Sequence, residues 1–251
     1  MAYTTNLKGA SGSFSQAMSD GFGIVTVMNA YVCDALSTDT LKDLNPYQIA
    51  NANYEVGEAV PNAGDNDEDA KVLCRLETLK VANVTMEGPT KTVTGGQFSN
   101  PLIKFGKSAR LEMQDALGNG MAIAALCGGI AESEEFSAGP EIKALHFGED
   151  FVGPKMIIGD SFIIDRKSGQ QVPVKIVFYQ FLPDSIFNLT QDAEGDATVF
   201  DMNGDLLTTV VTISDEYGDP IQHGLFYSIV DPRATTPDYA SSGHEQADEE
   251  A

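Results

Sequence analysis

The segment PKMIIGDSFIIDRKSGQQVPVKIVFYQFLP, residues 154–183, carries the strongest β-strand pattern in the chain. It contains two runs rich in β-branched and aromatic residues, which are separated by RKSGQQ at 166–171. Two such runs on either side of a polar, glycine-containing stretch are typical of a β-hairpin. The segment therefore predicts two antiparallel strands joined by a turn.

Outside this segment, further strands are expected within residues 22–36, 71–94, 101–118, 199–213 and 224–230. Asn203-Gly204 stands between two β-prone runs and predicts a tight hairpin turn. One helix is expected at 119–131, with Asn119 as its N-cap and Gly128-Gly129 as its end. Roughly nine to eleven short strands with one short helix predict a mainly β fold, an antiparallel β-sandwich or barrel.

The chain is expected to form one β domain with loosely structured ends. Residues 1–22 are small and polar and indicate a flexible N-terminal arm, and residues 23–231 form the domain. Within the domain, residues 37–70 are expected to be a long loop, either a partner-binding excursion or partly disordered. Residues 232–251 are polar and acidic and predict a flexible tail.

The stretch PLIKFGKSARLEMQDALG, residues 101–118, contains Gly106, Lys107 and Ser108, which match the last three residues of a P-loop motif. A P-loop requires glycine where this chain has Pro101, and proline has no N–H with which to bind phosphate. The residues that follow alternate between apolar and polar, which indicates a strand instead of the helix that a P-loop requires. A turn leading into a strand is the better interpretation.

The net charge is the strongest global property of the chain. It has 37 acidic and 15 basic residues, a formal charge of −22. Such a surface repels nucleic acid and anionic membranes. There is no apolar run of the roughly 18–20 residues that span a bilayer, and the N-terminus lacks a secretory pattern. We expect a soluble protein made in a cytoplasm.

No pattern in the sequence predicts a reaction site. Cys33, Cys74 and Cys127 are far apart and are expected to be buried free thiols. The three histidines are isolated from one another and from any identifiable nucleophile. Asp65, Asp67 and Asp69 have part of a calcium-loop spacing but lack the glycine that should follow, so cation binding there stays open. We expect no catalytic residue, no metal and no cofactor.

Three quoted stretches resemble the major tail (tail tube) proteins of long-tailed bacteriophages. They are KSARLEMQDALGNG at 107–120, MAIAALCGG at 121–129 and VPVKIVFYQFLPDSIFNLTQDAEGDATVFDMNGDLL at 172–207. The resemblance covers about residues 70–212, through soft patterns: a strand ending in DAL, a short helix and a late polar hairpin. The stretches 37–70 and 232–251 have no counterpart in it.

The resemblance implies a structural virion protein located in the phage tail. Such proteins form hexameric rings that stack into a hollow tube, with self as the main partner and tape measure and terminator proteins as neighbours. DNA would pass through as cargo during ejection, without being held, and no membrane is involved. On this view the loop around Gly95-Gly96 contacts other subunits, and the expected interface residues are Thr92, Thr94, Gly95, Gly96, Phe98 and Pro101.

Two other classes remain open from the sequence. A capsid decoration or head-completion protein would share the β fold and the lack of chemistry but would form compact oligomers or monomers. A non-viral acidic β-fold enzyme or binding module is the other alternative. Carbohydrate-binding modules normally expose aromatic residues on a sheet face, and this chain contains no tryptophan.

Overall fold

The long hairpin at 154–183 is the centre of the fold. The computed structural model describes residues 12–24, 29–77, 79–88, 90–92, 102–104, 106–115, 120–136, 139–149, 151–184, 200–214 and 219–234. Strand β10 (Lys155–Asp165) pairs antiparallel with β11 (Gln171–Pro183), as the sequence predicts. At the turn, the Asp165 carboxylate accepts a hydrogen bond from the Lys167 N–H at 3.0 Å. Gly169 has φ +69°, a conformation that favours glycine.

Strands on both sides of this hairpin extend it into one large antiparallel sheet. Its main path runs β3-β2-β10-β11-β12-β7-β4, while β1 also pairs with β10 and β15 with β11. The bounds are β1 (Phe22–Ile24), β2 (Asn29–Asp34), β3 (Val72–Leu76), β4 (Leu79–Glu87), β7 (Ser108–Asp115), β12 (Phe200–Leu206) and β15 (Tyr227–Val230). The prediction of a mainly antiparallel β fold is confirmed.

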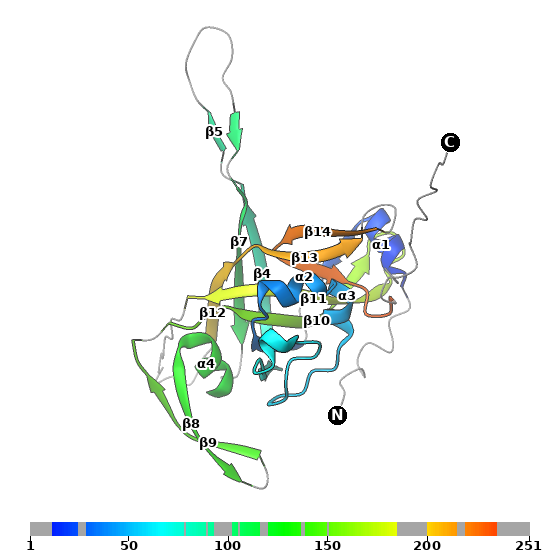
Figure 1. Cartoon of the computed structure of the whole chain (residues 1–251). Coiled ribbons are helices and arrows are strands. Elements are labelled where there is room, and N and C mark those ends of the chain that lie inside the picture. The colour runs from blue at the N-terminus through cyan, green and yellow to red at the C-terminus, as the bar shows by residue number, and fades with distance from the viewer. Residues whose placement is uncertain are drawn as a thin grey trace, which may run out of the picture.

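Three further hairpins pair only internally in the described part of the chain. They are β5 (Thr90–Thr92) with β6 (Leu102–Lys104), β8 (Gly129–Phe136) with β9 (Gly139–Phe147), and β13 (Thr209–Ser214) with β14 (Pro220–Leu225). Figure 1 shows β5–β6 projecting from one end of the molecule, on the continuation of β4 and β7. The β8–β9 hairpin projects from the opposite end.

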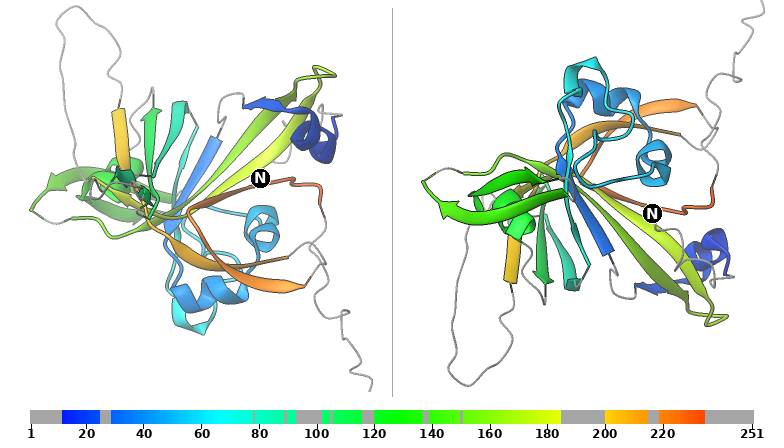
Figure 2. Two further views of the ribbon diagram at one scale, coloured as in Figure 1. Left: turned by 90° about the horizontal axis from the view of Figure 1, so that it is seen from above. Right: turned by 90° about the horizontal axis from the view of Figure 1, so that it is seen from below.

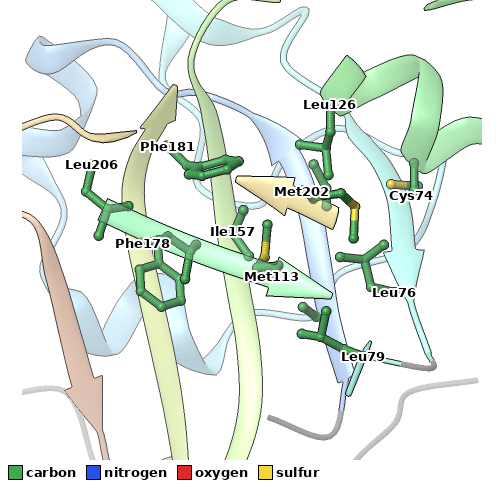
Figure 3. Close-up of a cluster of buried hydrophobic side chains, with 14 of the residues drawn as sticks. Cys74, Leu76, Leu79, Met113, Leu126, Ile157, Phe178, Phe181, Met202 and Leu206 are labelled. Atoms are coloured by element: carbon green, nitrogen blue, oxygen red, sulfur yellow. The ribbon is translucent and has the colours of Figure 1, made fainter. Parts of the chain in front are cut away.

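Buried side chains form a core on each face of the sheet. On one face, Leu126 of helix α4 (Gly120–Cys127) belongs to a core that includes residues of β2, β3, β7, β11 and β12. Figure 3 shows Leu126 near Met202 in this core. On the other face, helices α2 (Thr38–Asp43) and α3 (Pro46–Asn51) pack with β13 over Met156, Ile158 and Tyr179. The views in Figure 2 show α2 and α3 in blue beside the orange β13–β14 hairpin. Strands β10 and β11 are apolar on both faces because both are covered.

The prediction of a long loop at 37–70 is wrong, since this segment folds onto the second core. It contains α2, α3 and the 3-10 turn η2 (Asp65–Asp67), and Leu41, Ile49 and Val60 are buried. Helix α3 begins with a capping box in which the side chains and backbone N–H groups of Asn45 and Gln48 bond reciprocally. Caps of this kind satisfy the free N–H groups of a short helix. The fold therefore contains helices α2 and α3 in addition to the single helix that the sequence predicts.

Two other boundaries differ from expectation. Helix α4 ends at Cys127, and residues 129–131, which the sequence predicts as the last part of the helix, instead begin strand β8. In the expected N-terminal arm 1–22, residues 14–20 form helix α1 (Phe14–Asp20), whose Ala17 is buried against the β10–β11 hairpin. Residues 1–11 and the tail from 235 onward lie outside the described residues.

The predicted hairpin turn at Asn203-Gly204 is also wrong, because both residues lie inside β12. A Cβ atom on Gly204 would lie 2.2 Å from the Leu182 carbonyl oxygen and 2.8 Å from the Pro183 Cα. Glycine at this position allows β12 to approach β11 closely, and a close approach of two backbones is a common reason for glycine inside a strand.

Candidate functional site: a polar sheet face with open edges

The outward face of β4, β7 and β12 is a continuous polar surface. Pairing between the three strands aligns Asn83, Glu112 and Asn203 in one row across the sheet. The next row consists of Thr85, Arg110 and Asp205. Neighbouring positions on the same strands, such as Leu111, Met113 and Met202, are buried in the first core. The alternation places polar side chains on one face and the core on the other because side chains in a strand alternate with period 2.

Hydrogen bonds link the polar side chains across strands. Arg110 Nη1 donates to Asp205 Oδ1 at 3.2 Å, and the guanidinium also donates to the Asp184 carboxylate. These hydrogen bonds, with the Asp184 bond as the main cause, raise the pKa of Arg110 above its ordinary value. Gln114 Nε2 donates to Asp201 Oδ1 at 3.0 Å. Arg110 thus joins Asp184, the residue that follows β11, to β7 and β12.

This polar face carries a net negative charge. Strands β4, β7 and β12 together with Asp184 hold two cations, Lys80 and Arg110, and six carboxylates: Glu87, Glu112, Asp115, Asp184, Asp201 and Asp205. Six negative charges less two positive charges leave −4. Glu87, Glu112, Asp201 and Asp205 are exposed to solvent, and Asp184 is half-buried. Their field therefore acts on whatever passes in front of the sheet.

Among the described residues, backbone groups on both sides of the three-stranded unit have no strand partner. Strand β4 pairs with β7 along Leu79–Glu87, and no described strand pairs with its other edge. Strand β12 pairs with β7 along its whole length but with β11 only at 204–206, although the Asn203 carbonyl accepts from the Asp184 N–H at 2.8 Å. Exposed strand edges of this kind readily pair with another chain.

The β5–β6 hairpin, which we call the arm, extends the same β4–β7 ribbon beyond the core. Thr90, Lys91 and Thr92 pair with Lys104, Ile103 and Leu102. Of the interface residues expected from the sequence, the structure places Thr92 in β5; Thr94, Gly95, Gly96, Phe98 and Pro101 lie outside the described residues. Gly106 and Lys107 are exposed at the arm base, and Ser108 starts strand β7. A strand therefore follows the GKS triplet, as expected.

The remaining candidate functional groups in the described chain are the three cysteines and two histidines. Cys33, Cys74 and Cys127 are free and buried, as expected. Burial raises the pKa of Cys33 far above its ordinary value and that of Cys127 to about 11, so neither forms a thiolate near neutral pH. His146 Nε2 lies 3.2 Å from Glu132 Oε2 at an exposed site, and His223 is exposed on β14.

The acidic stretch at 65–69 is organised around a hydrogen-bonded carboxylate. The Asp67 side chain accepts hydrogen bonds from the Ser37 N–H at 2.9 Å and the Ser37 hydroxyl at 2.8 Å, and so fixes the start of α2. Asp65 and Asp69 are exposed to solvent. In the described part of the chain, no three His, Cys, Asp or Glu side chains gather in a way that could hold a metal ion.

Searches against protein-family models and against curated proteins returned no match to this chain. Among the described residues, no helix is both long and apolar enough to cross a lipid bilayer. The polar face, its open edges and the arm are therefore the features on which a functional interpretation rests.

The sequence identifies β7 as a strand but does not reveal the polar face to which it belongs. The alternation in SARLEMQD shows that one side of β7 is polar. It does not show that β12, about 90 residues later, lies beside it, because strand pairing is nonlocal. The alternating polar residues Asp201, Asn203 and Asp205 were a usable signal, but the Asn203-Gly204 dipeptide favoured a turn instead.

Proposed function

We infer that the protein is a self-assembling tail tube subunit of a virion. One observation supports this most: a carboxylate-rich face lies on β4, β7 and β12, which with Asp184 have net charge −4, and among the described residues the outer edge of β4 and the start of β12 have no strand partner. Pairing of such edges between neighbouring copies would turn separate faces into one closed wall. Ring closure requires that each copy present two different edges, as this sheet does.

The charge of the face suits a channel for DNA. In the proposed ring, the polar faces of all copies line the hole, and the opposite face of β4, β7 and β12 is buried in each copy's own core. A wall of fixed carboxylates repels phosphate groups, so a duplex can slide without binding. The channel then guides DNA as cargo, and no reactive group is required of it.

Assembly must also overcome the electrostatic repulsion between negatively charged copies. The chain has net charge −22, and like charges oppose association over about 8–10 Å at physiological ionic strength. Backbone pairing at β4 supplies hydrogen bonds between N–H and C=O groups that do not depend on side-chain charge, and salt screens the repulsion between charged side chains. Moderate salt should therefore favour assembly at the strand edges.

Electron microscopy of the purified protein tests the proposal directly. We expect negatively stained samples at moderate salt to show hollow tubes of uniform width. Small closed oligomers would instead favour a capsid decoration or head-completion protein. A monomer that remains monomeric at millimolar concentration, or one that turns over a small molecule, would contradict the assignment.

A further inference from the structure

A lysine and an aspartate lie opposite each other in the central hairpin of the large sheet. Asp160 of β10 and Lys175 of β11 are direct partners in the antiparallel pairing, and Lys175 Nζ lies 4.0 Å from Asp160 Oδ1. Only 16% of the Asp160 side chain and 18% of the Lys175 side chain are exposed. Because opposite residues of antiparallel strands place their side chains on the same face, the two groups are held side by side away from most of the solvent.

Apolar side chains surround this pair. Ile158 and Val177 lie two residues away on the same strands and therefore on the same face, and both are buried in the core beneath α2 and α3. Val230 of β15, which pairs with Lys175 on its other side, is also buried. An ion pair in such surroundings loses much of its hydration, which is offset only by hydrogen bonds of good geometry. At 4.0 Å the ammonium and carboxylate are too far apart to form one with each other.

Burial shifts both groups toward their uncharged forms. It raises the pKa of Asp160, although the nearby charges of Lys175 and Arg75 act in the opposite direction. It lowers the pKa of Lys175, against the effect of the Asp160 charge. An uncharged amine is a nucleophile and an uncharged carboxyl group is open to attack at its carbon, whereas an ammonium and a carboxylate are unreactive toward each other. Transfer of one proton from Lys175 to Asp160 makes both groups reactive.

From this arrangement we propose that Lys175 and Asp160 become joined by an amide bond within the folded chain. Lys175 Nζ attacks Asp160 Cγ, the Nζ–Cγ bond forms, and one Cγ–O bond breaks to release water. Of the three protons of the ammonium group, two leave with that water and one stays on the amide nitrogen, so no oxidant or activating group is required. The fixed proximity of the two groups supplies what a reaction between separate molecules lacks.

Arg75 of β3 has a defined role in this step. Its charge acts on the Asp160 carboxyl group, and its guanidinium lies 5.5 Å from the centre of the Tyr31 ring. Attack on Cγ places negative charge on a carboxyl oxygen of Asp160, and a fixed cation nearby stabilises that charge. The resulting bond would close the β10–β11 hairpin covalently within one copy. It does not depend on assembly into tubes.

A second lysine–aspartate pair in the same sheet provides the matched comparison. Lys155 of β10 donates to Asp34 of β2 at 2.8 Å, and the Asp34 carboxylate also accepts a hydrogen bond from the Lys71 N–H at 3.2 Å. The Asp34 side chain is 33% exposed, so water solvates it as well. Hydrogen bonds and solvent both favour the charged form of a carboxyl group. We therefore expect this pair to remain an ion pair.

The intact mass of the purified, denatured protein tests the proposal. We expect a mass lower than that of the sequence by one water molecule, and a tryptic digest in which residues 156–166 are linked to a peptide that contains an uncut Lys175. Lys175→Arg keeps the positive charge but removes the amine, so it should have the full mass, whereas Lys155→Arg should keep the loss. A native protein of full mass, or a loss that survives in Lys175→Arg, would overturn the proposal. The native measurement requires no variant, so it holds even if a variant fails to fold.

Treatment with hydroxylamine separates the amide from the other product that lacks one water. A cyclic imide at Asp20-Gly21 would have the same mass, but hydroxylamine opens imides and leaves amides intact. We expect the loss of mass to survive the treatment, and its reversal would overturn the amide bond. Arg75→Gln should yield a mixture of linked and unlinked chains in freshly purified protein. Complete linkage in that variant would overturn the role of Arg75 while leaving the bond itself established.

Discussion

Arg110 Nη1 lies 3.2 Å from Asp205 Oδ1, on residues that face each other directly across β7 and β12. The same guanidinium bonds to Asp184, where the chain leaves β11. The Arg110 guanidinium therefore bridges two carboxylates, Asp184 and Asp205, that would otherwise repel each other. The face keeps a net negative charge because this single arginine compensates only part of it.

Replacing Arg110 with glutamine should lower stability slightly. The Arg110 side chain is 40% exposed, and partly exposed ion pairs contribute up to about 1 kcal/mol. We expect a loss of about 0.5–1 kcal/mol in urea unfolding at low salt, and less in 1 M NaCl. Arg166→Gln, at an exposed turn, should have a smaller effect. A loss of several kcal/mol that persists in salt would show that Arg110 has a different, buried role.

Asp67 should stabilise the fold through the start of α2. Asp67→Ala removes the hydrogen bonds to the Ser37 N–H and hydroxyl, and hydrogen bonds to a charged group contribute about 1.5–3 kcal/mol. Chemical denaturation should therefore show a loss of about 1–3 kcal/mol. Asp69→Ala, an exposed neighbour, is the control and should be nearly neutral. Equal effects of both changes would contradict a specific role for Asp67.

The same carboxylate should make stability depend on acid pH. Partial burial acts to raise the pKa of Asp67, but hydrogen bonds from Thr40 and Ser37 outweigh it and hold the pKa below its ordinary value. A carboxyl whose pKa is lower in the folded state stabilises the fold above its unfolded pKa, near 4, and loses this contribution as pH falls through the folded value. The difference in stability between native protein and Asp67→Asn should shrink below pH 4. A constant difference from pH 7 to pH 2 would be inconsistent with this.

Gly204→Ala should disrupt the β11–β12 contact. The added methyl group would meet the backbone of Leu182 and Pro183, which cannot move as a side-chain end can. Overpacking of this kind costs about 1–3 kcal/mol. Gly153→Ala, where the added atom has no neighbour within 4 Å, is the matched control. Thermal unfolding of the two variants should differ by several degrees, and equal melting temperatures would show that β12 does not approach β11 this closely.

The thiols should be inert in the folded protein. A thiol reagent at pH 8 should modify Cys33, Cys74 and Cys127 only after unfolding, because all are buried and burial raises the pKa of Cys33 and Cys127. The number of reacted thiols should rise from near zero to three on adding denaturant. Rapid reaction of the native protein would indicate an accessible thiolate and reopen the question of catalysis.

Deleting residues 90–100 should separate folding from assembly. The deletion removes β5 and the residues beyond it, and none of the described residues in this range belongs to a buried core. We expect a monomer with unchanged far-UV circular dichroism that forms no tubes. If the shortened protein still forms tubes, the arm has no part in subunit contact.

The sequence predicted local structure better than it predicted pairing. The β10–β11 hairpin, β3, β4 and β7 follow from alternation and β-branched content, which are local properties. The Asn45, Pro46 and Gln48 pattern was a local helix signal as well, but the high polarity of residues 37–70 favoured a loop. The pairing of β12 with both β7 and β11 depends on contacts distant in sequence, which alternation within one strand does not reveal.

The position of the polar face in an assembly tests the central claim most directly. A cryo-electron microscopy map of the assembled protein should show β4, β7 and β12 of each copy facing a central hole, with the β4 edge hydrogen-bonded to the neighbouring copy. Asp201 and Asp205 would then line that hole. A map in which this face points outward, or in which β4 remains unpaired between copies, would contradict the account.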